Sequence, residues 1–256
     1  MSALEYVRIL SCFSMLSYAS WRDLKTREVS DWVWIAFGVP GIAIDVFELY
    51  SGSVSVLGLV IPVAFSSILS FILAYLGLFG GADFKAFVVL SVLLPNPPMV
   101  VQPLLGMVSI VYPLTMFSNS ALAGALMALV MLAVNLSSRR ESTLFDDFKS
   151  ESRWKKLAVL ISGRRLKIED VRGPPFHYPL EEPNGEDYSA RRLVIMPNTE
   201  DDDKAVEIFR KLKDQGVREV WVSHTLPFIV FMLFGFLVTI LIGDVALSAM
   251  RETIFR

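Results

Sequence analysis

Cysteine and histidine are scarce in this chain of 256 residues. Cys12 is its one cysteine, so the chain cannot form an internal disulfide and its redox compartment stays undetermined. The two histidines, His177 and His224, lie in a polar region without the motif spacing of a metal site, a phosphate-binding loop or a nucleophile elbow. We therefore expect no metal and no cofactor, and we interpret both histidines as surface or interfacial residues.

Charge is scarce outside one region. Residues 137–224 hold 17 of the 24 Lys and Arg residues and 17 of the 26 Asp and Glu residues. Hydrophobic residues make up 54% of the sequence, against about 45–50% in soluble proteins. This composition excludes disordered, collagen-like and coiled-coil proteins. Because acids balance bases in the polar region, no basic face is left for nucleic acid, which we do not expect as a partner.

Apolar runs long enough for membrane spans make up most of the remaining sequence. A helix needs about 20 mostly apolar residues to cross the hydrocarbon core. The candidate spans are residues 4–20, 32–50, 54–78, 84–94, 112–136 and 225–247, of which 84–94 is short. Residues 99–111 contain Pro103 and follow a proline-rich break, which favours an interfacial or re-entrant stretch. We predict an α-helical polytopic membrane protein with about six transmembrane helices in the lipid bilayer.

Basic residues beside the spans predict how the chain is oriented in the cell membrane. They follow the first and fifth candidate spans: Arg22, Lys25, Arg27, Arg139 and Arg140. The loops at 51–53 and 95–111 carry none. We therefore expect both termini outside and the polar region in the cytoplasm. The expected parts are a membrane domain (1–136), a cytoplasmic domain (137–224) and a last transmembrane helix with its tail (225–256).

The polar region consists of shorter elements. Its β-prone runs are residues 157–161, 165–168, 192–196 and 219–222. An acidic start at 201–203 leads into a helix over 204–215, which Gly216 ends. We predict a small α+β domain of three or four strands and one helix, inserted before the last transmembrane helix.

A few charged residues lie inside or at the edges of the candidate spans, where charge is costly and usually functional. They are Arg8, Asp45, Glu48, Asp83, Lys85 and Asp244. Asp45, Glu48 and Asp244 lie near the outer ends of spans, so we expect water to solvate them. Arg8 is three residues from Glu5, and these two side chains could pair.

Asp83 differs because three small residues precede it: Gly80, Gly81 and Ala82. Small residues let backbone and substrate approach closely. In the expected topology, Asp83 lies at the cytoplasmic mouth of the third and fourth spans. Asp23 follows the first span and lies at the same depth. Two acids from distant parts of the sequence are thus expected at one face of the membrane.

Two adjacent carboxylates can carry out aspartyl proteolysis. Because they do not both ionise easily, they share one proton. The ionised carboxylate takes a proton from water while the protonated one donates to the scissile carbonyl. A structural alternative stays open: Asp23 caps a helix or pairs with Arg22 or Lys25, and Asp83 caps the fourth span.

Two local signatures resemble those of a known protease family. The run from Ser20 to Trp34 (SWRDLKTREVSDWVW) resembles the first catalytic signature of archaeal preflagellin/prepilin peptidases. Residues 80–85 (GGADFK) resemble the G-x-G-D-x-K motif of that family, with Ala82 in place of the second glycine. Six spans and a cytoplasmic domain before the last one also match. The resemblance therefore covers nearly the whole chain.

The resemblance implies a class III signal peptidase, a GxGD-type membrane aspartyl protease that needs no metal. Its partners would be archaellin and type IV pilin-like precursors, cut at the cytoplasmic face just before their hydrophobic stretch. Asp23 and Asp83 would be the catalytic pair. Gly80 would allow close backbone approach, with Gly81 and Ala82 beside it.

Substrate choice is a separate expectation. Glu28 and Asp31 are the acids nearest the aspartate pair on the cytoplasmic loop, and a charge-assisted contact from them could select a basic residue before the cut. Glu28 could instead pair with Lys25 or Arg27. Lys85 is interpreted as a side chain that reaches toward the interface rather than as a catalytic group.

Two rival functions stay open on sequence alone. One is a non-enzymatic transporter or scaffold with a cytoplasmic regulatory domain, although the spans offer almost no midplane charge for ion coupling. The other is a protease that cuts inside the bilayer. The placement of both aspartates at span ends favours a cut beside the membrane.

Overall fold

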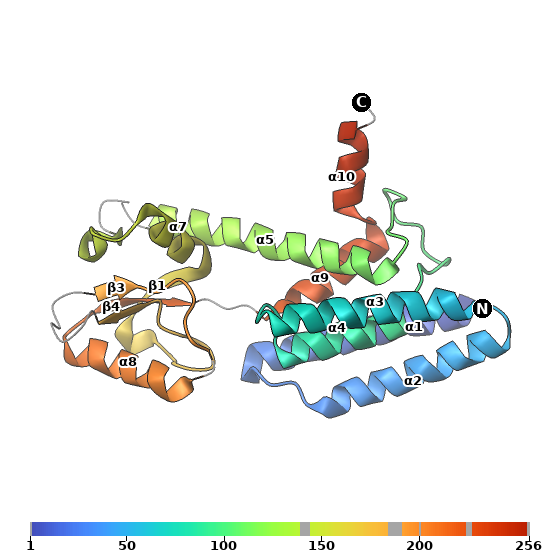
Figure 1. The fold of residues 1–256 in the computed structure, drawn as a ribbon, viewed down its shortest axis with the longest axis horizontal. Helices are drawn as coiled ribbons and strands as arrows, with labels where there is room; N and C mark the ends of the chain where they lie inside the picture. Colours follow the sequence, from blue (N-terminus) through green and yellow to red (C-terminus); the bar gives the residue numbers. More distant parts are fainter. Residues whose placement is uncertain (1, 139–143, 184–190, 200, 224–226, 255–256) are drawn as a thin grey trace. The chain divides into compact units, whose positions relative to one another are not determined.

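The computed structural model describes residues 2–138, 144–183, 191–199, 201–223 and 227–254. The chain forms two compact units (Figure 1). The helical unit contains residues 1–124 and 227–256, and the polar unit contains residues 125–226. Helix α5 (Tyr112–Ser138) belongs to both units, because the boundary between them falls within it.

The helical unit is built from α1 (Ser2–Thr26), α2 (Asp31–Tyr50), α3 (Val56–Tyr75), α4 (Gly81–Leu93), the first half of α5, α9 (Phe228–Leu241) and α10 (Val245–Ile254). Its core includes Met15 and Leu16 of α1, Phe87 and Leu90 of α4, and Phe236 of α9. In lipid, such side chains stabilise a bundle by close packing rather than by removal from water. Helix α4 contacts α1, α2, α3 and α9, and therefore lies at the centre of the unit.

Length and hydropathy qualify three helices of the described chain as membrane spans: α2, α3 and residues 112–137 of α5. Helices α9 and α10 qualify together as a fourth, bent by 55°. Helix α4 has 13 residues and extends about 20 Å, against about 30 Å of hydrocarbon. A mostly helical fold with three to four candidate membrane spans and a small strand-containing region is confirmed, whereas six spans stay a prediction.

The last candidate span is broken rather than continuous. Gly243 has a φ of +103° between α9 and α10, a conformation that glycine adopts without strain. Backbone groups freed by the break pair with residues 104–107: Leu104 N–H with Leu241 C=O (3.0 Å), Leu105 N–H with Ile242 C=O (2.8 Å) and Asp244 N–H with Met107 C=O (2.7 Å). Irregular backbone is tolerated in a membrane protein where other protein groups satisfy it in this way.

Asp244 is buried, so the expectation that water solvates it was wrong. Its Oδ1 accepts the N–H of Leu247 (2.9 Å) and thereby caps the start of α10. Asn119 of α5 also binds the break: its Nδ2 donates to the Gly243 carbonyl (2.8 Å) and to Oγ1 of Thr239 (2.9 Å). Side-chain hydrogen bonds from Asn119 and Asp244 thus stabilise the break in this span.

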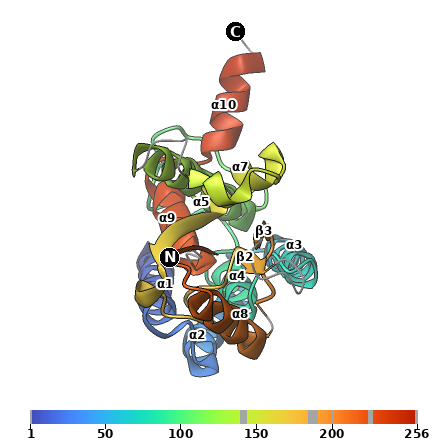
Figure 2. The same cartoon turned by 90° about the vertical axis from the view of Figure 1, so that its left-hand side faces the viewer.

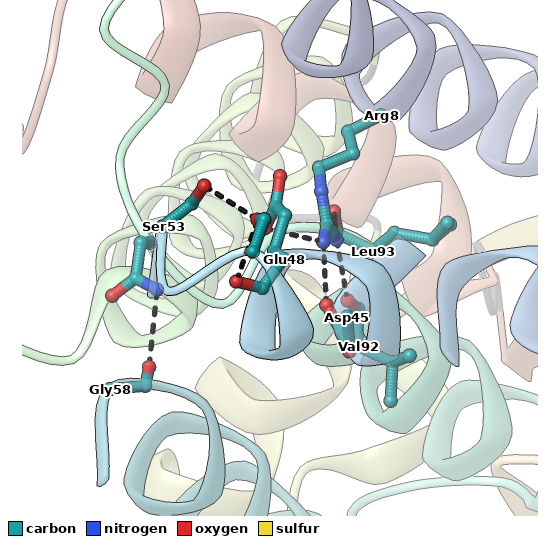
Figure 3. A network of polar contacts seen from close by, with 9 residues as sticks. Arg8, Asp45, Glu48, Ser53, Gly58, Val92 and Leu93 are labelled. Atoms are coloured by element: carbon teal, nitrogen blue, oxygen red, sulfur yellow. Dashed lines mark hydrogen bonds and ion pairs between the residues drawn. The ribbon is translucent and has the colours of Figure 1, made fainter. Parts of the chain in front are cut away.

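Arg8 of α1 connects this helix with α2 and α4 (Figure 3). Its guanidinium donates to Asp45 (2.6 Å) and Glu48 (3.0 Å) of α2 and to the carbonyls of Val92 (3.2 Å) and Leu93 (2.9 Å) near the end of α4. The expected solvation of Asp45 and Glu48 was therefore wrong. Both acids form ion pairs with the buried guanidinium of Arg8.

Glu5 does not pair with Arg8, which the sequence had suggested as a possible partner. Its Oε2 accepts the backbone N–H of Val100 instead, at 2.9 Å. The first turns of α1 thus hold the loop after α4 as well as α2.

The polar unit has a layer of strands with helices on opposite sides (Figures 1 and 2). Strands β1 (Gly163–Lys167) and β4 (Glu219–Ser223) pair antiparallel, as do β2 (Glu181–Pro183) and β3 (Arg191–Leu193). Short 3₁₀ turns η1 (Asp146–Phe148) and η2 (Ile168–Asp170) complete it with helices α7 (Arg153–Ser162) and α8 (Asp202–Asp214). Trp221 of β4 packs with the cluster that contains α7 residues, and Val220 and Val222 pack with α8, as strand alternation requires.

The expected strand at 157–161 was wrong, because these residues belong to α7. Oγ of Ser152 accepts the N–H of Lys155 (3.3 Å) and so caps the helix start. Val159 and Leu160 are buried while Leu157 and Ile161 are exposed, which is a helical rather than an alternating pattern. The other three β-prone runs overlap β1, β3 and β4, and the helix at 204–215 corresponds to α8.

We expect Arg8→Met to lower the free energy of unfolding in detergent by about 3–5 kcal/mol, because it leaves Asp45 and Glu48 without their cation. Lys85→Met is the matched control: it removes a cation whose carboxylate partner, Asp31, is 70% exposed, and should cost at most about 1 kcal/mol. Equal losses in the two variants, measured by denaturant titration, would contradict a structural role for the Arg8 network.

Candidate active site

Asp23 lies in the last turn of α1, which continues beyond Ser20 to Thr26. Its side chain is almost fully buried, with 9% of the residue exposed. Lys25, one of the partners considered from the sequence, lies over the ring of Trp21 at 5.2 Å instead. Arg27 follows with a φ of +59°, which ends the helix. Burial raises the pKa of Asp23, and the charge of Arg27 offsets part of that rise.

Asp83 lies in the first turn of α4, three residues after the N-cap Gly80. Its Oδ2 accepts the N–H of Gly80 at 3.0 Å. Because glycine has no side chain, only this half of a capping box exists here. Oδ1 of Asp83 is buried and accepts no hydrogen bond of ordinary geometry from the described residues, although the N–H of Ile229 lies close enough to the carboxylate to lower its pKa. The expected alternative that Asp83 is the N-cap of this helix was wrong, because Gly80 holds that position and Asp83 reaches back to it from the third helical residue.

Asp23 lies close enough to Asp83 for its charge to affect the pKa of Asp83. Both lie outside the apolar runs 4–20 and 84–94. Burial, followed by the charge of Asp23, raises the pKa of Asp83 to about 6, although the Gly80 N–H and the nearby N–H of Ile229 act in the opposite direction. Burial also raises the pKa of Asp23. The structure thus brings together the two acids singled out from the sequence.

Aromatic rings surround the start of α4. Phe79 precedes it and lies 5.0 Å from the ring of Phe228 and 6.1 Å from that of Phe117, measured between ring centroids. Oγ of Ser20 donates to the carbonyl of Ile229 (3.3 Å), which connects α1 with the first turn of α9. Sequence reasoning missed these neighbours, because nothing in an apolar run marks which residues will face an acid from another helix.

The small residues before Asp83 differ in their surroundings. A Cβ on Gly81 would meet nothing within 4 Å, whereas a Cβ on Gly80 would lie 3.4 Å from Oδ2 of Asp83. Ala82, which stands where the resembling motif has glycine, packs its methyl group against the helical core. The core therefore accommodates this departure from the motif.

Lys85 and Asp31 form an ion pair beside the aspartates, at 2.6 Å between Nζ and Oδ1. The pair joins the start of α2 to α4. Glu28 is exposed on the loop between α1 and α2. Among the described residues, no three Cys, His, Asp or Glu side chains gather as metal ligands would. The chemistry available to this arrangement is that of one buried and one partly buried carboxylate.

Comparisons with known proteins define the class. A model of the type IV leader peptidase family matches residues 10–135, and one of the archaeal peptidase A24 C-terminus, type II, matches residues 155–245. The chain belongs to the type IV leader peptidase family and is a protease.

Three curated preflagellin peptidases are similar to the chain. That of Methanocaldococcus jannaschii is 25% identical over 90% of this chain and 91% of its own. Those of Methanococcus maripaludis and Methanococcus voltae are 26% and 24% identical, over 90% and 91% of this chain and 92% and 94% of their own. The similarity thus includes both units.

We expect the carboxyl stretch of Asp83 to titrate at about pH 6 in an infrared pH titration of the membrane-embedded protein. In Asp23→Asn this pKa should fall, because removing a neighbouring negative charge makes ionisation easier. Loss of the band in Asp83→Asn would assign it to Asp83. The control variant Asp31→Asn should leave the pKa of the band unchanged. An Asp83 pKa that is unchanged by Asp23→Asn would contradict the proximity of the two acids.

Proposed function

We propose that this protease is a membrane-embedded aspartyl endopeptidase that removes signal peptides from archaellin and type IV pilin-like precursors, with Asp23 and Asp83 as its catalytic pair. The observation that carries the proposal is the buried Oδ1 of Asp83, which accepts no hydrogen bond of ordinary geometry from the described residues, together with the influence of Asp23 on the pKa of Asp83. The names of the similar preflagellin peptidases support the substrate class. Membership of a protease family argues against the transporter or scaffold alternative.

The proposed reaction uses one proton shared by the two carboxylates. The ionised carboxylate takes a proton from a water molecule, whose oxygen attacks the scissile carbonyl carbon. The protonated carboxyl donates its proton to the carbonyl oxygen, which gives a neutral tetrahedral intermediate. Collapse breaks the C–N bond, and the proton taken from water passes to the leaving amine. One hydroxyl of the intermediate returns its proton to the carboxylate that donated first, which restores the shared proton of the pair. We assign neither aspartate a fixed role, because the two titrate as a pair.

The surroundings of Asp83 suit this chemistry. Burial raises the pKa of its carboxyl to about 6, so a fraction of it stays protonated near neutral pH, whereas a solvated aspartate would be almost fully ionised. A Cβ on Gly81 would meet nothing within 4 Å, so the backbone at the helix start is open to the approach of a substrate peptide. No metal enters the proposed reaction.

Asp23→Asn and Asp83→Asn should each reduce cleavage of a preflagellin-type precursor by at least about a thousandfold, because Asn keeps the size but cannot carry the shared proton. Membrane insertion should be unchanged. Asp170→Asn, an exposed position in η2, is the control. Asp45 and Asp244 are unsuitable as controls because both have structural partners. Turnover within a few-fold of normal in either dyad variant would rule out the two-aspartate reaction.

We propose that the active site faces the cytoplasm, in agreement with the basic residues beside the candidate spans. After Cys12→Ala, a cysteine in place of Ser53 should react with an impermeant thiol reagent added to intact cells. A cysteine in place of Lys149 should react only after permeabilisation. Labelling of position 149 in intact cells would show that the polar unit lies outside the cell. It would thereby contradict a cytoplasmic active site.

We also propose that the acids near the pair help to select basic residues before the cut. Glu28 is exposed, so Glu28→Gln should lower the ratio of kcat/KM for a Lys-containing to an Ala-containing precursor by roughly tenfold or less. Lys85 already neutralises Asp31, so Asp31→Asn should have a smaller effect. Lys85→Met should raise the ratio by freeing Asp31. A ratio unchanged in all three variants would place recognition elsewhere, most plainly in the polar unit.

A further inference from the structure

Helix α7 presents an apolar stripe to solvent. Trp154 is 77% exposed, and Leu157 and Ile161 are 38% and 37% exposed. These positions are spaced i, i+3 and i+7, which places them on one side of an α-helix. The opposite side carries Val159 and Leu160, which are buried in the core of the polar unit. The stripe is therefore additional to the apolar surface that the fold needs.

The charge of α7 is of one sign. The helix contains Arg153, Lys155 and Lys156 and no acidic residue. Lys155 pairs with Glu151 (2.9 Å), and Lys156 lies over the ring of Phe145 (5.9 Å), whereas Arg153 is exposed beside the stripe. An exposed apolar stripe with a tryptophan and a basic border is typical of helices that lie in the interface of an anionic membrane.

The position of α7 in the polar unit fits such a surface. Nδ2 of Asn135, near the end of α5, donates to the carbonyls of Leu160 and Gly163, each at 2.8 Å. These bonds fix the end of α7 to the last turns of the helix that is expected to leave the bilayer at residue 136. With 10 residues, α7 is about 15 Å long, so no part of it lies farther than about that distance from the fixed end.

Helix α5 also exposes an apolar surface within the polar unit. Leu126, Leu129, Val130 and Val134 are exposed on the part of α5 within the polar unit. In a span these side chains contact lipid. The stripe on α7 therefore belongs to the same unit as a surface already expected to contact the bilayer.

We infer that α7 is an interfacial helix, which inserts Trp154, Leu157 and Ile161 among the headgroups of an anionic lipid leaflet. A second protein surface would not explain why the border is basic and why the helix is attached where a span ends. Insertion holds the polar unit against the membrane through a contact separate from its covalent connections. This inference does not depend on the aspartate pair, so either proposal can fail without the other.

The test uses the full-length protein with Cys12→Ala and a single spin-labelled cysteine. Leu157→Cys and, in a second variant, Trp154→Cys report on the stripe. Arg210→Cys on α8 is the control, because α8 lies on the opposite side of the strands from α7 (Figures 1 and 2). Each variant is reconstituted into vesicles of phosphatidylcholine alone, or of phosphatidylcholine and phosphatidylglycerol in equal parts.

Collision with oxygen and with a water-soluble nickel chelate measures the depth of each label. We expect stripe labels in phosphatidylglycerol vesicles to favour oxygen over nickel several-fold more than the control label does, and to lie less deep in phosphatidylcholine. Nickel collision as frequent at both stripe positions as at position 210 would overturn the inference. Shielding from both reagents would overturn it too, because protein would then cover the stripe. Equal depth in both vesicles would overturn the assignment to anionic lipid.

Discussion

The central packing of α4 is the constraint on which the rest of the helical unit depends. Phe87 and Leu90 on this helix pack with α1 and α9, which places its first turn beside the end of α1. At its other end, the carbonyls of Val92 and Leu93 accept from Arg8. A helix too short to cross the hydrocarbon is therefore fixed at both ends by its neighbours. Its length decides where Asp83 lies.

The same packing explains the electrostatics of the site. An aspartate at a helix start ordinarily stays solvated and ionised, because the N-terminal backbone N–H groups favour a negative charge. Here α1 and the first turn of α9 bury Asp83 and leave one of its oxygens without a hydrogen bond of ordinary geometry from the described residues. Burying this carboxylate lowers the stability of the fold, and the packing of the core around α4 offsets that loss.

Local sequence patterns predicted the elements well and their surroundings poorly. Asp23 and Asp83 stood out because carboxylates near apolar runs are rare, and the capping of α8 by Asp201 follows from local chemistry. The solvation of Asp45, Glu48 and Asp244 was wrong for one reason. The neighbouring sequence does not show that Asp45 will pair with an arginine 37 residues away. It also does not show that the last span will break at Asp244.

What the sequence by itself determined is the set of apolar helices, the polar insertion and the two aspartate motifs, because these depend on composition and short-range spacing. Only the tertiary structure decided that the last span is broken, that Phe79 packs against Phe228, and that Ile229 lies near Asp83. The physical reason is that burial and the pairing of charges arise between segments distant in the chain, and close packing alone selects which segments meet.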